Sequence, residues 1–139
     1  MAFRVSMTRQ SIYLVEQDDI VRDSLKVLLE SNGFEVEDFR TIAGMPCDDK
    51  FSQAGCLMLG FDRHIEEGLA LTRALNDGGP HLPVVFLVGR GEPAARAAAI
   101  RAGAFAYLER PVKESVLTYT VRNALQSRRQ GLAANGTAP

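Results

Sequence analysis

The side chains that could do chemistry in this sequence lie at the ends of its short apolar runs. Glu16 and Gln17 follow the first run, and Arg110 follows the fifth. Carboxylate and amide oxygens are ligands that a magnesium ion accepts, and a guanidinium group binds anions through paired hydrogen bonds. Gly60 follows the third run and Val88 ends the fourth, so two of these positions carry no reactive group.

Two interpretations of Glu16 and Arg110 are open from the residues alone. They form an ion pair that ties the first run to the fifth, or they are two separate solvated charges. We expect no metal site and no other cofactor. Glu16 and Asp62 are the candidate metal ligands, and one or two carboxylates without a phosphate partner bind magnesium weakly.

The other polar residues near these positions are interpreted first as surface loops. Asp62 is expected to be a solvated carboxylate near a helix start. His64 and His81 have no cysteine or histidine partner at metal-ligand spacing. The glycine-rich loop 89–91 either needs unusual backbone angles or, with guanidinium groups nearby, presents its amides to an anion.

Five apolar runs alternate with five helical or small-residue stretches. The runs predict strands at residues 12–15, 34–39, 56–59, 83–88 and 105–108. Helices are predicted from an N-cap at Asp18 or Asp19 to Asn32, and over residues 67–77, 92–102 and 113–127. The stretch 42–52 should be a poor helix, because Gly44 and Pro46 oppose it.

Alternating strands and helices predict an α/β protein with a doubly wound, five-stranded parallel sheet. Ligands of such a sheet bind beyond the carboxyl ends of the strands, so the positions described above should surround one crevice. We expect residues 1–10 to be an N-terminal extension and residues 11–127 to form the domain. Residues 128–139 are expected to be a flexible tail or a linker stub.

Composition narrows the class of protein. The chain of 139 residues is 46% hydrophobic and 24% charged, with a net charge of -1. These values are ordinary for one globular domain and give no general attraction to nucleic acid or to an acidic membrane. No apolar run approaches the ~20 residues of a membrane helix. Cys47 and Cys56 are too few for a disulfide framework, so we expect free thiols and a cytoplasmic location.

An ordered set of residues resembles the receiver domain of response regulators in two-component signalling. The set covers about residues 11 to 127 and consists of the segment 14–18 with Gly68-Leu69, Pro83, Gly103-Ala104 and Arg110-Pro111. The resemblance implies a flavodoxin-like sheet with strand order 2-1-3-4-5. It also implies a cis peptide bond before Pro111 and places Tyr107 at the aromatic switch position of the family.

The resemblance also implies which groups a phosphate-accepting receiver needs. These are an acidic pair after the first strand, an acceptor aspartate after the third, a hydroxyl after the fourth and a lysine after the fifth. The corresponding residues here are Glu16, Gln17, Gly60, Val88 and Arg110. Glycine offers no nucleophile, and valine offers no hydrogen-bond donor. The resemblance therefore implies a degenerate pseudo-receiver that is not an enzyme and lacks a phosphoacceptor.

Protein binding is the function that remains for such a receiver in phosphorelay-type signalling. Receivers commonly dock partners through the fourth helix, fifth strand and last helix, where we expect a smooth alanine surface beside charged residues. The switch and interface candidates are Tyr107, Pro111, Arg96, Arg101, Lys113 and Arg122. Mixed charges beside small residues favour a two-fold homodimer or a complex with a signalling kinase or regulator. No membrane contact and no direct nucleic-acid contact are expected.

Three alternatives differ from this interpretation in class. In the first, Asp62 serves as an unorthodox phosphoacceptor within a phosphotransfer chain. In the second, the sequence is the regulatory domain of a transcription factor whose output domain is missing from it. The third is a flavin carrier, which the acidic segment 16–19 disfavours because it would repel a phosphate group.

Overall fold

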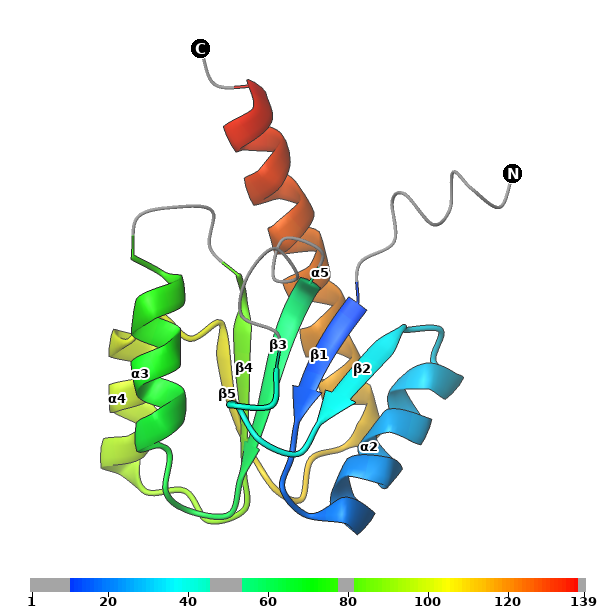
Figure 1. Ribbon diagram of the computed structural model, residues 1–139, viewed down its shortest axis with the longest axis vertical. Helices are drawn as coiled ribbons and strands as arrows, with labels where there is room; N and C mark the ends of the chain where they lie inside the picture. The colour runs from blue at the N-terminus through cyan, green and yellow to red at the C-terminus, as the bar shows by residue number, and fades with distance from the viewer. Residues whose placement is uncertain (1–10, 46–53, 78–81, 138–139) are drawn as a thin grey trace.

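Five strands form one parallel sheet, in the order β2-β1-β3-β4-β5 (Figure 1). The computed structural model describes residues 11–45, 54–77 and 82–137. The strands are β1 (Ser11–Val15), β2 (Val36–Phe39), β3 (Ala54–Phe61), β4 (Val84–Val88) and β5 (Ala106–Glu109). The predicted fold class and strand order are therefore confirmed.

The central strands are buried on both faces, which explains their unbroken apolar sequences. All of β4 is buried, and so is β3 up to Gly60. Strand β3 is longer than predicted, because Gly60 pairs with Leu87 and Phe61 pairs with Val88. Gly60 thus lies inside the strand instead of after its end, since backbone pairing with β4 decides where β3 stops.

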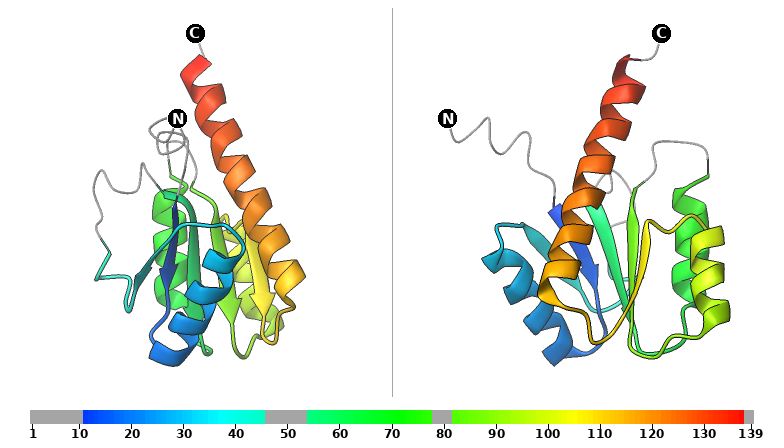
Figure 2. Two further views of the ribbon diagram at one scale, coloured as in Figure 1. Left: turned by 90° about the vertical axis from the view of Figure 1, so that its right-hand side faces the viewer. Right: turned by 180° about the vertical axis from the view of Figure 1, so that it is seen from behind.

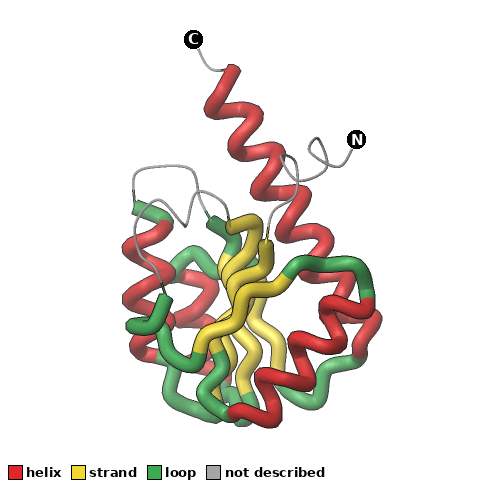
Figure 3. Tube along the Cα trace, turned by 45° about the vertical axis from the view of Figure 1, so that its right-hand side comes forward, coloured by secondary structure: helices red, strands yellow, loops and turns green. Residues whose placement is uncertain are grey.

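Two helices cover each face of the sheet (Figures 2 and 3). Helices α2 (Asp19–Ser31) and α5 (Glu114–Thr137) lie on one face, and α3 (Glu66–Leu75) and α4 (Pro93–Arg101) lie on the other. Successive side chains of a strand point to opposite faces of the sheet, so they pack into two separate cores. Met58 packs with α5 in one core, whereas Phe86 packs with α3 and α4 in the other. None of the described helices is long and apolar enough to cross a membrane.

Helix α2 begins and ends at the residues that the sequence indicated. The Asp18 carboxylate accepts hydrogen bonds from the amides of Ile20 at 2.9 Å and Val21 at 3.1 Å. These bonds satisfy two of the free amides at the helix start. At the other end, Asn32 is followed by Gly33, whose φ of 92° is accessible to glycine at little cost.

The stretch predicted as a poor helix at 42–52 is not helical where the structure describes it. Residues 42–45 form turns and bends, and the amide of Gly44 donates to the carbonyl oxygen of Thr41. The remainder of the stretch lies outside the described residues, as do Cys47 and His81. Within the described part of the chain, four helices cover the sheet.

Helix α5 continues to Thr137, beyond the predicted end at Ser127. Its last turns project past the sheet (Figure 1). Arg128 is buried, and its Nε donates to the carbonyl oxygen of Ala54 at 3.2 Å. Burial lowers the pKa of this guanidinium group. The expectation of an irregular tail from residue 128 is corrected by the helical backbone, whereas the limits assigned to the domain remain a prediction.

Two alanines of α4 face the core. Ala99 is completely buried, and Ala95 packs against the core cluster that contains Phe86. Ala97 is exposed. The predicted smooth alanine surface is therefore wrong for Ala95 and Ala99, because these small side chains face inward and allow α4 to lie close to the sheet.

Cys56 is a free thiol inside the sheet. It is completely buried, and desolvation raises the pKa of its thiol to about 12. The thiol therefore stays protonated at physiological pH and behaves as a small apolar side chain.

The cap of α2 gives a stability prediction. Asp18→Ala should lower the free energy of unfolding by about 1 kcal/mol, because two amides lose their acceptor. Urea denaturation followed by circular dichroism measures this change. Asp23→Ala, at an exposed site of the same helix, is the matched control and should cost less than about 0.5 kcal/mol. Equal losses in the two variants would contradict the assigned cap.

Candidate functional site

A buried ion pair joins the ends of β1 and β5. Nη2 of Arg110 donates to Oε1 of Glu16 at 2.7 Å. The side chain of Glu16 is 7% exposed and that of Arg110 is 28% exposed. Of the two interpretations open from the sequence, the ion pair is therefore the one that the structure contains.

The second carboxylate oxygen of Glu16 is also engaged. Oε2 accepts the backbone amide of Asp18 at 3.0 Å. The backbone of Glu16 is fixed as well, because its amide donates to Phe39 and its carbonyl accepts Nη1 of Arg22 at 2.9 Å. A buried carboxylate requires such partners, since an unpaired charge in the interior is costly.

Gly60 lies against this ion pair. A Cβ atom added at Gly60 would overlap Oε1 of Glu16 and would lie 3.2 Å from Nη2 of Arg110. The φ angle of Gly60 is not positive, so the backbone conformation does not demand glycine here. A side chain at position 60 would require the Glu16 carboxylate to move, which would disturb its contact with Arg110.

The remaining positions of the crevice differ in exposure. Val88 is completely buried and is turned into the core. Gln17 is exposed and lines an open cleft of about 600 Å³ above Gly60. The full lining of this cleft is Glu16, Gln17, Asp18, Gly60, Phe61, Asp62, Arg63 and His64. The topology therefore brings together the polar positions after β1 and β3, as predicted. Among the described residues that line the cleft, Glu16 is the one buried carboxylate, and it is held in the ion pair with Arg110.

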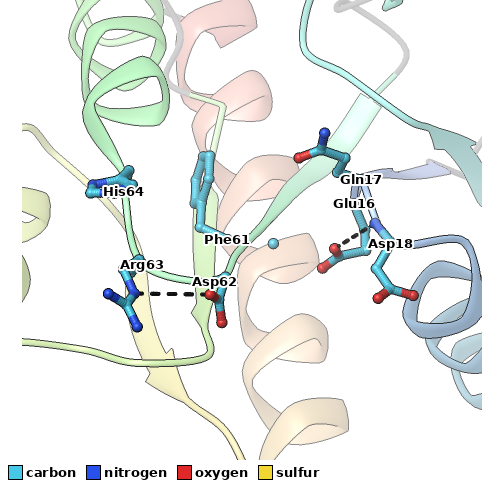
Figure 4. A pocket seen from close by; sticks show the side chains of 8 residues that line it. Glu16, Gln17, Asp18, Phe61, Asp62, Arg63 and His64 are labelled. Carbon is cyan, nitrogen blue, oxygen red and sulfur yellow. Dashed lines mark hydrogen bonds and ion pairs between the residues drawn. The ribbon is translucent and has the colours of Figure 1, made fainter.

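Asp62 lies at the rim of the cleft (Figure 4). Its side chain is 76% exposed, and Oδ2 lies 4.0 Å from Nε of Arg63. A pair this long and exposed contributes little to stability. His64 is also exposed. In the described part of the chain, no group of three or more His, Cys, Asp or Glu side chains is arranged to hold a metal ion.

The loop 89–91 uses two of its backbone amides within the fold. The amide of Gly89 donates to Phe61 and that of Arg90 donates to Asp62, both at 2.7 Å. These bonds extend the pairing of β3 with β4, so neither amide is free for an anion. No residue of this loop has a positive φ, which makes the expected unusual backbone angles wrong.

Limited space, and not an unusual backbone angle, explains the glycine at position 91 of this loop. A Cβ atom at this position would overlap Oε2 of Glu109 and would lie 2.6 Å from the hydroxyl oxygen of Tyr107. Only the tertiary structure reveals this constraint, because Gly91 and the two side chains it accommodates are far apart in sequence.

Tyr107 is held in an inward position. The residue is 4% exposed, its ring stacks on Phe86 at 6.4 Å, and the guanidinium of Arg96 lies 5.0 Å from the ring centroid. Burial raises the pKa of Tyr107, and the Glu109 carboxylate adds to the rise. The hydroxyl has no partner in hydrogen-bonding geometry among the described residues, although the nearby backbone of Glu92 partly offsets the rise in pKa.

The other interface candidates do not share one surface. Pro111 follows a cis peptide bond, as the resemblance implied, and Lys113 is exposed beside it. Arg101 is exposed at the end of α4, about 140° around the helix from Arg96. Arg122 does not lie on the face to which the sequence analysis assigned it. Its guanidinium lies 5.5 Å from the ring of Phe34, on the α2 side of α5, because the helix turns it away from β5.

The ion pair gives the second stability prediction. Arg110→Met keeps the aliphatic stem and should lower the free energy of unfolding by about 2–3 kcal/mol, because Glu16 is left buried without its charge partner. Arg63→Met, which removes an exposed and long ion pair, is the control and should cost less than about 0.5 kcal/mol.

Adding Glu16→Gln to Arg110→Met tests the coupling. The double variant should recover part of the loss in the same urea titration, because the neutral amide no longer needs a cation. Strictly additive losses would contradict the pairing.

The sequence is similar to that of known regulators. The family model of the response regulator receiver domain matches residues 12–122. The response regulator protein TodT of Pseudomonas putida is 32% identical over 115 residues, which are 83% of this chain and 51% of TodT. The transcriptional regulatory protein FixJ of Azorhizobium caulinodans is 32% identical over 126 residues, which are 86% of this chain and 57% of FixJ. This chain thus spans about half the length of these relatives.

Solved structures agree on the fold. A CheY-like receiver domain protein from Methanospirillum hungatei superposes with a TM-score of 0.73 at 24% identity, over 88% of this chain and 98% of the other. The family match covers all five strands and four-fifths of the sequence, and the structure has the strand order that the resemblance implied. The chain belongs to the response regulator receiver domain family.

Proposed function

We propose that this chain is a receiver domain that does not accept phosphate and acts by binding a protein partner. The observation that carries the proposal is the overlap between the Glu16–Arg110 ion pair and the space in which a side chain at Gly60 would begin. An acceptor carboxylate at this position would need that space, and Val88 next to it offers no hydroxyl.

The residues of the crevice do not fit the magnesium ion of an active receiver. Magnesium takes oxygen ligands in near-octahedral geometry. Both carboxylate oxygens of Glu16 are engaged by Arg110 and by the amide of Asp18, and Gly60 supplies no oxygen ligand from a side chain. Arg110 places a positive charge against the same carboxylate, which opposes the binding of a cation there. We therefore propose that the ion pair replaces the metal as the link between β1 and β5.

The α4–β5–α5 face is the best candidate for the partner surface. In the described residues, six large hydrophobic side chains are exposed, and four of them lie on α4, before β5 and on α5. They are Ile100, Phe105, Val116 and Tyr119. Exposed apolar side chains that gather on one face commonly mark a protein contact. Partner binding in two-component signalling is the role that this surface supports.

Asp62 is the alternative candidate for a phosphate acceptor, because its exposed carboxylate lines the same cleft.

A second candidate function for the whole protein comes from the relatives. FixJ is named a transcriptional regulatory protein, and this chain matches about half of it. The chain could accordingly be the regulatory half of a transcriptional regulator, and the complete open reading frame with its genomic neighbours would test this.

Phosphorylation is the direct test of the proposal. The chain should gain no ~80 Da adduct when it is incubated with acetyl phosphate and magnesium and analysed by intact-mass spectrometry, because Gly60 supplies no nucleophile and Asp62 is exposed at the rim of the cleft. A robust adduct that disappears in Asp62→Ala would reject the proposal in favour of the unorthodox acceptor.

Gly60→Asp examines the steric argument separately. Its carboxylate would be forced against Glu16, so the variant should remain unmodified and should unfold at lower urea concentration than the wild type. Phosphorylation of this variant would mean that the rest of the crevice is competent and that only the nucleophile is missing.

A further inference from the structure

Two opposing effects act on Tyr107 in its buried position. Its ring gains contacts there, because it stacks on Phe86 and lies 5.0 Å from the guanidinium carbon of Arg96. Its hydroxyl oxygen has no partner in hydrogen-bonding geometry among the described residues, and a buried polar group without a partner costs free energy. The inward position is therefore a balance. Ring packing favours burial, and hydration of the hydroxyl group favours exposure.

The crevice contributes no polar contact to this balance. Val88 is completely buried in the same core cluster as Tyr107, and its side chain offers the hydroxyl group neither a donor nor an acceptor. Within the described ranges, neither Glu16 nor Arg110 contacts the ring or contributes to the raised pKa of Tyr107. The position of the ring is thus decided outside the crevice.

Gly91 leaves the space that the hydroxyl group occupies. A Cβ atom at position 91 would overlap Oε2 of Glu109 and would lie 2.6 Å from the hydroxyl oxygen of Tyr107. Glu109 is exposed at the end of β5, so its carboxylate can turn into solvent. The tyrosine hydroxyl has no such freedom, because it moves only with its rigid ring.

Hydrogen bonds anchor the backbone on both sides of position 91. Two amides of the loop 89–91 donate to carbonyl oxygens near the end of β3, both at 2.7 Å. On the other side, the carbonyl oxygen of Glu92 accepts the amides of Ala95 and Arg96 in the first turn of α4. A methyl group added at position 91 should therefore displace the Tyr107 ring and not the loop.

We propose that Gly91 is a positioning residue for the α4–β5–α5 face, and that it keeps Tyr107 inward by leaving space for the hydroxyl group. The inference rests on the proposed function, because it says how that partner surface keeps one shape without a phosphate signal. A methyl group at position 91 shifts the balance and turns the tyrosine hydroxyl toward solvent. The ring then leaves Phe86 and Arg96, so the partner surface changes while the crevice does not.

Nitration of tyrosine by tetranitromethane, mapped by peptide mass spectrometry, tests the inference. The chain has three tyrosines. Tyr119 is 67% exposed and Tyr13 is 1% exposed, so they serve as internal standards for an accessible and a protected ring. In the wild type, Tyr107 should be protected as Tyr13 is. In Gly91→Ala, nitration of Tyr107 should be at least about tenfold faster, while Tyr13 stays protected.

A second glycine supplies the matched control. A Cβ atom at the exposed Gly44 would meet only Thr41, whose Oγ1 would lie 3.2 Å away. Gly44→Ala should therefore leave Tyr107 protected.

Tyr107→Phe separates this role from general destabilisation, because it removes the oxygen atom that the added methyl group meets. Gly91→Ala should lower the midpoint of urea unfolding clearly in the wild-type background and much less in the Tyr107→Phe background. If Gly91→Ala alone does not fold, the double variant should still fold. An equal loss in both backgrounds, or a double variant that does not fold, would overturn the inference.

The crevice variant Arg110→Met examines the independence of the two regions. Tyr107 should stay protected in this variant while circular dichroism shows a folded chain. Nitration of Tyr107 in folded Arg110→Met or in the wild type would overturn the inference, and so would protection of Tyr107 in folded Gly91→Ala.

These outcomes are distinct from a failure of the proposed function. A phosphoryl adduct on Asp62 would reject the proposed function alone, provided that Tyr107 stays protected in the modified chain. Exposure of Tyr107 on phosphorylation would overturn the inference as well.

Discussion

A carboxylate buried at the end of β1 imposes the main constraint on this molecule. Glu16 is almost completely enclosed, and a charge in such a place is tolerated only if it is paired and hydrogen-bonded. Arg110 supplies the charge, the amide of Asp18 supplies the second donor, and Gly60 supplies the room. These contributions come from three different strand ends, so the carboxylate ties the crevice together across the sheet.

We propose that the same constraint removes the phosphate chemistry of the fold. In an open parallel sheet, the carboxyl ends of the strands form the place where ligands bind. Here the deepest part of the crevice is filled by Glu16 and Arg110, which form an ion pair with each other. The crevice becomes a structural joint between β1 and β5, and the cleft above it is lined by exposed loop residues such as Asp62 and His64. We propose that the fold is retained while its site serves stability.

The outer surface is organised independently of the crevice. Tyr107 lies inward because Gly91 leaves space for its hydroxyl and because Phe86 and Arg96 enclose its ring. None of these contacts involves Glu16 or Gly60. The position of Tyr107 in the α4–β5–α5 face is thus set by local packing.

The resemblance to receiver domains implied the strand order. Local patterns in the sequence were enough to predict the parallel sheet, the cap at Asp18 and the turn at Gly33. These features depend on hydrophobic periodicity and on neighbouring residues, which a linear sequence displays. The pairing of Glu16 with Arg110 remained undecided, since 94 positions separate the two. The roles of Gly60 and Gly91, the direction of Arg122 and the inward alanines of α4 were likewise decided only in three dimensions. Each of these features depends on which side chains from distant parts of the sequence come into contact, and tertiary packing alone determines those contacts.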